Sequence, residues 1–518
     1  LGGLSRMSGG VIQSYGREQG LPDSTVLTIL GDRDGSLWLG TDGGGLVRFR
    51  DNRFEALPAA SGFLNDIVRY VFEDREGSLW VGTAGGGLAR ISDQPFTVFG
   101  KREGMSSNLI SSVAGSRSGG VWVGTADGIS RIEGVGRAAA RVSSELDGKP
   151  AWPVYEDSRA DLWVCAEPSS LYRFPNGNLR SPHRRSWDLH ARCRTIAEAS
   201  DGAIWIGTVK GLYTVRNNSL VEFTTSDGLP SDRVSAVLAA PGGALWIGTP
   251  KGLSRYRDGR FETWRKQDGL SFDNIVSLHL SEDGALWIGT YGGGLIRFFE
   301  GRFTNCTTGR GLPDDYIYSI AEDGLGSFWM TSRTGVIRVR KKDLLAAMSG
   351  ARLTLPLTQY APHGLLKSTE FNFGAQPAVC RTRDGRLWFP AYGGAVAIDP
   401  KVPISNPVPL PVYLEAVTAD ASPTELAAGV RLNPAVRALE FRYTAPSLLR
   451  PELVRFRYRL DGFDRSWVDA QDRRTAYYTS LRSGKYSFRV TASDNGSTWT
   501  EPGARFDFEI LSPWYQTA

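Results

Sequence analysis

The sequence predicts an all-β protein, in which β-propeller repeats of about 42 residues per four-stranded blade are followed by an immunoglobulin-like β-sandwich. Three observations support this prediction. The 518 residues include 61 Gly and 15 Trp, which suggests many tight turns and many large apolar side chains. One phrase, of the form ALWIGTYGGGLIRF, recurs along most of the chain. After Pro400 this period ends, and shorter alternating segments follow a Pro-rich linker.

The recurring phrase occurs nine times, in six well-preserved and three degenerate copies. Successive copies are 41 or 42 residues apart, except the last, which follows an insertion around Lys341 to Pro356. Each copy carries one Trp, because a blade that packs face to face on its neighbours needs a large apolar side chain at an equivalent position. We therefore expect a structural role for Trp38, Trp80, Trp122, Trp163, Trp205, Trp246, Trp287, Trp329 and Trp388.

One repeat, around Trp246, illustrates how each unit becomes four strands. The expected strands are Val234 to Ala239, Ala244 to Thr249, Leu253 to Arg257 and Arg260 to Trp264. Gly-containing turns separate these strands, and such turns suit tight antiparallel hairpins. The 3.6-residue period and the caps of a helical repeat are both missing from the sequence, so the pattern favours a propeller blade.

The number of repeats exceeds the roughly four to eight blades that are usual for one ring. We expect two rings. Residues 1–92 would be the end of a first β-propeller that starts in the middle of a blade, and residues 93–403 would form a seven-bladed β-propeller. A strand near Phe96 to Phe99 could close the second ring, because little sequence is left for an outer strand after Ile398. A single ring of eight or nine blades is the alternative.

The residues from 404 to 512 have the pattern of a different domain. Segments such as Ala438 to Tyr443 and Lys485 to Ala492 alternate apolar and polar residues, and turn signals such as Asp461-Gly462 separate them. A length of about 100 residues with about seven short strands suits an immunoglobulin-like sandwich.

Part of this domain, RFRYRLDGFDRSWVDAQDRRTAYYTSLRSGKYSFRVTASDNGSTWTE, resembles the Y_Y_Y domain, which is named for its three tyrosines. The matching residues are Tyr458, Tyr478 and Tyr486, and from their chemistry we interpret them as core residues with hydrogen-bonded hydroxyl groups. The repeats resemble the two-component regulator propeller family. The segment STEFNFGAQPAVCRTRDGRLWFPAYGGAVAIDP resembles the last blade of that family.

This resemblance covers nearly the whole chain and implies a function. Propeller repeats followed by a three-tyrosine sandwich are characteristic of the extracytoplasmic half of membrane sensor kinases. The chain would then be the periplasmic sensor portion of a (hybrid) sensor histidine kinase, and residues 513–518 would begin its pre-transmembrane segment. The resemblance further implies a homodimer through the C-terminal sandwich. The output would be a histidine kinase or, in some members, a diguanylate cyclase.

Charge and composition exclude several classes of protein. The chain has 60 Lys and Arg against 55 Asp and Glu, a net charge of +5, and no basic run dense enough to predict a nucleic-acid partner. The 4 Cys are too few for a disulfide framework, and the sequence leaves their disulfide state open. No stretch approaches 18 apolar residues, so we expect a membrane to be reached only through a segment absent from this chain.

The sequence contains no catalytic or metal-binding constellation, so we expect no enzyme activity, metal or cofactor in this chain. It has 4 His and no GxSxG motif, which disfavours a nucleophile triad. His190 and Cys193 have an HxxC spacing, but no second pair completes a zinc site. His279 is expected to be a packed or pore-lining residue. Recurring carboxylate pairs such as Glu322-Asp323 stand just before turns, which predicts a structural role in the turn.

Binding is a better prediction than catalysis. In a propeller, the loops that lead into the inner strands share one face with the hairpins that follow the second strands. Repeats maintain the scaffold, so departures from the repeat on that face are candidates for specificity. The candidate ligand-binding residues are Arg192, Arg233, Asn274, Tyr291, Tyr316, Arg333, Glu370, Asn372 and Tyr392, with Lys210, Lys251 and Gln376 on the same face.

These aromatic, arginine, amide and carboxylate side chains suit a small polar ligand, such as an oligosaccharide, which some members of the resembled family sense. Two other functions stay open. A secreted propeller enzyme, such as a lyase or a glycosidase, would need an acid–base set clustered at the pore. A passive adhesion module would show no ligand-dependent change in the sandwich's partner.

Overall fold

The structure is a computed structural model that describes residues 2–57, 67–92, 96–135, 141–145, 148–351, 355–360, 371, 375–402, 408–427, 429–449, 451–494 and 498–512. The fold is all-β, as the sequence predicted. The chain divides into two units, one with residues Leu1–Gln94 and Ile404–Ala518 and the other with residues Pro95–Pro403. Among the described residues, no helix has the length and apolar character needed to cross a membrane.

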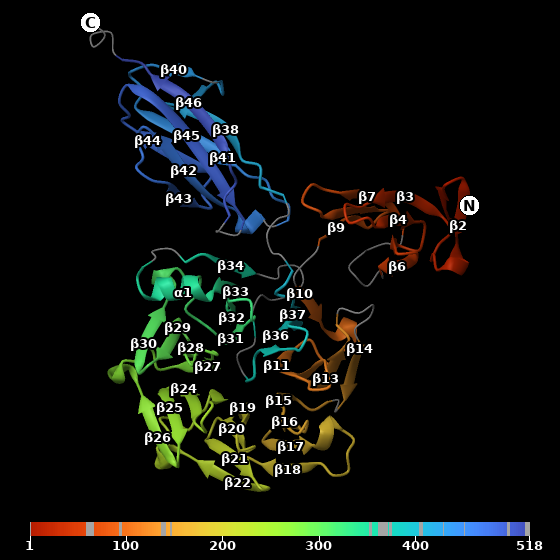
Figure 1. The fold of residues 1–518 in the computed structure, drawn as a ribbon, viewed down its shortest axis with the longest axis vertical. Coiled ribbons are helices and arrows are strands. Elements are labelled where there is room, and N and C mark those ends of the chain that lie inside the picture. Colours follow the sequence, from red (N-terminus) through yellow and green to blue (C-terminus); the bar gives the residue numbers. More distant parts are fainter. Residues whose placement is uncertain are drawn as a thin grey trace. The chain divides into compact units, whose positions relative to one another are not determined.

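The unit Pro95–Pro403 contains, within its described residues, seven four-stranded antiparallel sheets that are the blades of a propeller (Figure 1). In six of them the strands follow the chain from the inner strand to the outer strand. The first two blades are β11 (Ile110–Gly115), β12 (Val121–Thr125), β13 (Gly128–Glu133) and β14 (Arg141–Glu145), and then β15 (Ala151–Glu156), β16 (Leu162–Ala166), β17 (Ser170–Phe174) and β18 (Arg185–Asp188). The next two are β19 (Cys193–Glu198), β20 (Ile204–Thr208), β21 (Leu212–Arg216) and β22 (Ser219–Phe223), and then β23 (Ala236–Ala239), β24 (Leu245–Thr249), β25 (Gly252–Arg257) and β26 (Arg260–Trp264). The last two are β27 (Ile275–Leu280), β28 (Leu286–Thr290), β29 (Leu295–Phe299) and β30 (Arg302–Cys306), and then β31 (Ser319–Glu322), β32 (Ser327–Ser332), β33 (Gly335–Arg340) and β34 (Leu357–Tyr360). The helix α1 (Lys341–Met348) lies between β33 and β34 in the chain.

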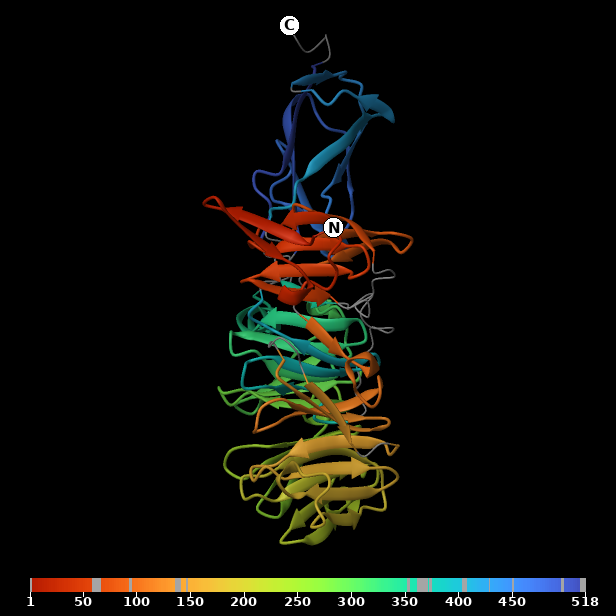
Figure 2. The same ribbon diagram turned by 90° about the vertical axis from the view of Figure 1, so that its right-hand side faces the viewer.

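The seventh blade combines both ends of this unit. Its strands are ordered β10 (Phe96–Phe99), β37 (Gly394–Ile398), β36 (Leu387–Ala391) and β35 (Cys380–Arg381), so the first strand of the unit is the outer strand of the last blade. Phe99 stacks on Trp388 with ring centres 5.4 Å apart. Consecutive inner strands contact one another from β11 to β31, and β11 also contacts β35 and β36. Figures 1 and 2 show these blades from two directions.

Several of the repeated Trp residues are held by the turns before them. All nine are buried except Trp80, which is half-buried. The indole N–H of Trp80 donates to Asp74 Oδ2 at 2.8 Å, and Asp74 Oδ1 accepts the backbone N–H groups of Glu76 and Ser78. Equivalent Trp–Asp bonds join Trp38 to Asp32, Trp163 to Asp157 and Trp329 to Asp323. The recurring carboxylates therefore have the turn role that their position predicted.

Gln376 ties together inner strands of several blades. Its backbone N–H donates to Arg194 O at 2.7 Å, and its side-chain Nε2 donates to Val276 O at 3.2 Å and to Tyr318 O at 3.3 Å. The next carbonyl, that of Pro377, accepts the N–H of Val113. Backbone from four blades thus converges on Gln376 and Pro377.

The first part of the other unit, Leu1–Gln94, contains strands of the same repeat. The described strands are β1 (Leu4–Ser8) with β2 (Val11–Tyr15); β3 (Val26–Gly31), β4 (Leu37–Thr41), β5 (Leu46–Arg50) and β6 (Arg53–Leu57); and β7 (Val68–Glu73), β8 (Leu79–Thr83) and β9 (Gly87–Ile91). Each of the three sheets is antiparallel.

The C-terminal part of that unit is a sandwich of two sheets. One sheet has the order β39 (Ser422–Thr424), β38 (Tyr413–Ala419), β41 (Ala438–Thr444), β44 (Thr475–Thr479); the other has the order β40 (Val430–Leu432), β46 (Ala504–Ile510), β45 (Gly484–Ser493), β42 (Arg455–Asp461), β43 (Val468–Gln471). Strands β40 and β46 are parallel.

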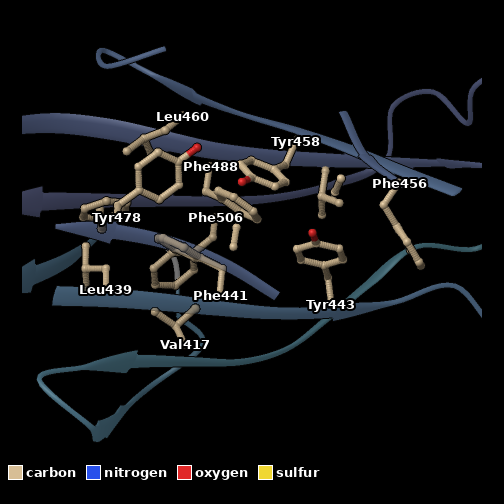
Figure 3. Packing of buried hydrophobic residues seen from close by; sticks show 14 of the residues in the cluster. Val417, Leu439, Phe441, Tyr443, Phe456, Tyr458, Leu460, Tyr478, Phe488 and Phe506 are labelled. Carbon is tan, nitrogen blue, oxygen red and sulfur yellow. The ribbon is translucent and has the colours of Figure 1, made fainter. Parts of the chain in front are cut away.

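Aromatic side chains from both sheets fill the core of the sandwich (Figure 3). Phe441 and Phe488 stack with ring centres 4.1 Å apart. Tyr458 and Tyr478 are buried, and the Tyr478 hydroxyl donates to Asp464. Tyr486 is half-buried, stacks on Phe508 and donates to Arg482 O at 2.9 Å. The three tyrosines thus pack in or against the core.

Candidate functional site

A pocket of about 320 Å³ opens where three neighbouring inner strands begin. It is lined by Arg194, Arg233, Ser235, Pro250, Asn274, Val276 and Tyr291. Three of the predicted residues, Arg233, Asn274 and Tyr291, are therefore brought together in one hollow. They come from the loops before β23 and β27 and from the hairpin after β28.

The loops that carry these residues are built alike. In each, a short 3₁₀ helix ends at a Gly with positive φ, such as Gly228 (φ 112°) or Gly269 (φ 97°), which a side chain would strain. A following Asp then accepts a backbone N–H of the helix: Asp232 from Thr225 at 2.6 Å and Asp273 from Lys266 at 2.7 Å. The residue after this Asp is Arg233 in one repeat and Asn274 in the next. The scaffold thus fixes the point at which each candidate residue leaves the loop.

Three lining residues occupy one repeat position in consecutive blades. Arg194, Ser235 and Val276 are spaced 41 residues apart. Each directly follows a buried residue, which is the first residue of the inner segment in its blade. The antiparallel register shifts between Cys193 and Thr195 and again between Ile275 and Ser277. Arg194 and Val276 therefore lie at β-bulges, which re-aim side chains at the rim of a sheet.

Arg194 was not predicted from the sequence, although a signal for it exists. The repeat position that holds Ser235 and Val276 in the next two blades holds Arg194 here. The candidates predicted from the sequence lie in loops and hairpins, whereas Arg194 lies on the inner strand β19 itself. Pro250, in the hairpin between β24 and β25, was also missed, because it differs little in character from other turn residues.

The pocket is electropositive around Arg194. Burial, followed by the nearby charges of Arg233 and Arg192, lowers the pKa of Arg194 to about 10. Its Nε atom is buried and, among the residues that the structure describes, has no hydrogen-bond partner. The structure therefore places a partly desolvated guanidinium beside a second one at the pocket.

A second group of predicted residues adjoins the pocket through Tyr291. The Tyr291 and Tyr316 rings pack edge to face with centres 4.8 Å apart, and a β-bridge joins the two residues. The guanidinium of Arg333 lies 3.8 Å from the centre of the Tyr316 ring and donates to the buried Asp314 through Nη2 at 2.8 Å and Nε at 3.2 Å. Hydrogen bonding to Asp314 raises the pKa of Arg333. Five predicted residues thus form one connected surface.

The remaining candidates do not line this pocket. Arg192 lies over the Trp152 ring at 4.5 Å and pairs with Glu167 at 3.2 Å. Tyr392 is exposed in the hairpin between β36 and β37. Glu370 and Asn372 lie outside the residues that the structure describes.

A disulfide stands next to the site. Cys165, on β16, and Cys193, the first residue of β19, are bonded and lie in neighbouring blades. Arg194 directly follows Cys193, so the disulfide fixes the blade-to-blade position of the strand that carries it. The other two cysteines, Cys306 and Cys380, are free, and burial raises the pKa of each thiol.

The described residues contain no group of three or more His, Cys, Asp or Glu side chains placed to hold a metal. Cys193 of the HxxC spacing is in the disulfide, and His190 Nδ1 lies 3.3 Å from Asp188 Oδ2. His279 packs edge to face on Phe328, and its Nε2 lies 3.7 Å from Glu322 Oε1. His279 is thus a packed residue between two blades.

Two family descriptions match parts of the chain. The "Two component regulator propeller" repeat matches residues 20–43, 62–85 and 269–292, and the "Y_Y_Y domain" matches residues 448–511. No curated protein matches the sequence.

A comparison with solved structures finds several similar chains, and the one with a TM-score of 0.70 shares the fold. The extracellular domain of the hybrid two component system BT3049 from B. thetaiotaomicron is 21% identical, with a TM-score of 0.70 over 99% of this chain and 76% of that one. The extracellular domain of the hybrid two component system BT4673 from the same organism is 17% identical over 99% of this chain and 73% of that one, with a TM-score of 0.46. Virginiamycin B lyase from Staphylococcus aureus is 16% identical over 58% of this chain and 97% of that one, with a TM-score of 0.45. By these family matches, the chain combines repeats of the two component regulator propeller family with a Y_Y_Y domain.

Proposed function

We propose that this chain is the extracytoplasmic ligand-sensing region of a membrane-bound two-component sensor kinase. Its propeller binds a small polar ligand, such as an oligosaccharide, and its sandwich passes the signal to transmembrane and kinase parts outside this sequence. The observation that carries the proposal is the pocket of Arg233, Asn274 and Tyr291 on a propeller whose chain also holds a Y_Y_Y domain.

Two observations support a location on the periplasmic side of the inner membrane. The Cys165–Cys193 disulfide joins two blades, and disulfides persist in oxidising compartments. The solved relative with a TM-score of 0.70 is the extracellular domain of a hybrid two component system. Both observations fit a sensor that faces away from the cytoplasm.

The ligand surface suits recognition rather than catalysis. Tyr291 and Tyr316 offer aromatic faces, and Asn274 and Arg233 offer hydrogen-bond donors, which together match the apolar faces and hydroxyl groups of a sugar. We propose that the chain itself is not an enzyme. Binding switches the output only through a difference in affinity between two states of a homodimer that forms through the sandwich.

The test is ligand binding by the purified chain. A panel of neutral and acidic oligosaccharides, scored by calorimetry, is expected to contain a compound that binds wild type and loses at least about tenfold in affinity with Tyr291→Ala. Tyr413→Ala, at an exposed tyrosine of the sandwich, is the matched control. Conversion of a panel compound into product would instead support the lyase or glycosidase alternative.

A second measurement tests the signalling part of the proposal. The coding sequence beyond Ala518 is expected to encode an apolar run of about 20 residues and then a kinase. A diguanylate cyclase in that place would keep the sensor and change its output. A stop codon within a few residues would overturn the membrane-sensor function.

A further inference from the structure

The pocket holds positive charge that forms no ion pair with the residues that the structure describes. Arg194 and Arg233 both line it, and among the described residues neither side chain forms an ion pair. The Nε atom of Arg194 is buried without a hydrogen-bond partner in this part of the chain. A desolvated guanidinium without a partner costs free energy. A ligand that supplies the missing hydrogen-bond and charge partner would recover this free energy on binding to the pocket.

Two other arginines on the same face of the propeller, by contrast, have charge partners. Arg192 has the carboxylate of Glu167 and the Trp152 ring as partners. Arg333 has the carboxylate of Asp314 and the ring of Tyr316. Among these four described arginines, the two that line the pocket are therefore the ones without an ion-pair partner.

We propose that this pocket binds an oxyanion, a carboxylate or a sulfate ester carried by a sugar ring, with Arg194 and Arg233 as its charge partners. The inference rests on the proposed sensor function and adds the chemical class of its ligand. A guanidinium presents N–H groups in a planar fork that fits the oxygens of either anion. Ser235 and Asn274 add a hydroxyl and an amide, and Tyr291 offers an aromatic face to the ring that carries the anion.

The apolar part of the lining strengthens this interaction. Pro250 and Val276 lie beside the two guanidinium groups, and Val276 is buried. Charged groups attract each other more strongly where such side chains exclude water. The backbone below is fixed, because Gln376 bonds to the carbonyl groups of both Arg194 and Val276. The anion site is therefore formed before the ligand arrives.

The experiment measures binding of three probes to the purified chain by calorimetry: sodium glucuronate, glucose 6-sulfate and glucose. We expect at least one of the two anionic probes, glucuronate or glucose 6-sulfate, to bind wild type at least about tenfold more tightly than glucose. Arg194→Gln or Arg233→Gln is expected to lower the affinity for that probe by about tenfold or more. Binding of the preferred anion is also expected to weaken as salt is added. The carboxylate and sulfate arms show which anion is preferred.

A charge-matched control separates a specific contact from the loss of general positive charge. Arg257 is exposed at the end of β25 and pairs with Asp258, so Arg257→Gln removes the same charge away from the pocket. Its effect on anion binding is expected to stay below about twofold, because exposed charges are screened. Arg194→Gln removes an unpartnered, partly buried charge, so its thermal midpoint is expected to equal or exceed that of wild type.

Two results would overturn the inference. One is equal binding of glucose and both anionic probes; the other is binding of an anion that Arg194→Gln and Arg233→Gln leave unchanged. Either result would leave the sensor function intact if a neutral oligosaccharide still binds in a Tyr291-dependent way. The absence of a membrane-anchored output domain beyond Ala518 would overturn the sensor function and leave anion binding by the pocket in place.

Discussion

The indole N–H of Trp163 donates to Oδ2 of Asp157 at 2.8 Å, and both side chains are buried. Oδ1 of the same carboxylate accepts the backbone N–H groups of Arg159 and Asp161. A single residue thus closes the turn between β15 and β16 and holds the large side chain that fills the space between blades. This relationship explains why the repeat pairs a carboxylate with a Trp six residues later.

Loss of this carboxylate should destabilise the propeller. Asp157→Ala leaves three N–H groups without their acceptor, two of them backbone, and each unsatisfied buried donor costs free energy. The free energy of unfolding is expected to fall by about 1–3 kcal/mol in urea titrations. Glu282→Ala, at an exposed turn residue before β28, is the control and should change stability by no more than about 0.5 kcal/mol. Equal effects of the two substitutions would contradict the assigned role.

Stability should depend on Glu322 in acid. The His279 and Ser281 side chains and the Lys341 ammonium group hold the pKa of Glu322 at about 2, although burial opposes this. A lowered carboxyl pKa contributes stability that is fully present above the ordinary value of 4.5 and is lost as the pH falls toward about 2. Because Glu322 is partly exposed and solvent screens its interactions, the contribution is expected to be on the order of 1 kcal/mol.

Glu322→Gln tests this directly. Wild type should lose stability between about pH 4.5 and pH 2 more steeply than the variant, as measured by thermal unfolding at each pH. The variant should also be less stable than wild type at neutral pH, where wild-type Glu322 is ionised. Parallel pH profiles of the two proteins would show that Glu322 does not titrate as stated.

The fold could be predicted largely because it is repetitive. A period set by Trp residues such as Trp246 and Trp287, with Gly turns between short apolar runs, leaves few alternatives to a propeller blade. The strand near Phe96 to Phe99 was expected from what the last repeat lacks, and β10 pairs with β37 there. The convergence of inner strands on Gln376 was not predicted, because it depends on long-range contacts that no local pattern encodes.

The site could be predicted only in part. Arg233, Asn274 and Tyr291 stand where the repeat changes in loops and hairpins, and the structure brings them together. Arg194 was missed because a β-bulge decides where an inner-strand side chain points, and the sequence does not reveal the bulge. The sequence leaves the Cys165–Cys193 pairing open, because a one-dimensional pattern contains no blade-to-blade distances.

The tyrosines of the sandwich should differ in their response to loss of the hydroxyl group. Tyr478 donates to Asp464, whose Oδ2 also accepts the N–H of Leu460, so Tyr478→Phe should cost about 1–2 kcal/mol of unfolding free energy. The hydroxyl of Tyr443 is buried and, among the described residues, has no partner. Tyr443→Phe should therefore be neutral or stabilising. Denaturant titration of both variants gives the comparison, and the reverse order of stabilities would contradict the described core.

The disulfide between blades should be a large single contribution to the stability of the propeller. Cys165 and Cys193 are 28 residues apart, and closing a loop of this size removes enough unfolded-state entropy to stabilise the fold by about 3.5 kcal/mol. We expect a dithiothreitol-treated protein to unfold at lower urea concentration than the oxidised one. The double variant Cys165→Ala, Cys193→Ala should unfold near the reduced protein.

The double variant is also the control for the reductant. Because its remaining cysteines, Cys306 and Cys380, are free, dithiothreitol should leave its unfolding curve unchanged. Mass spectrometry of wild type alkylated in denaturant should find two modified thiols before reduction and four after it. A shift of the double variant by the reductant, or four modified thiols in the oxidised protein, would contradict the disulfide. Because Arg194 follows Cys193 directly, reduction should also weaken anion binding in the pocket by loosening the strand that carries this guanidinium.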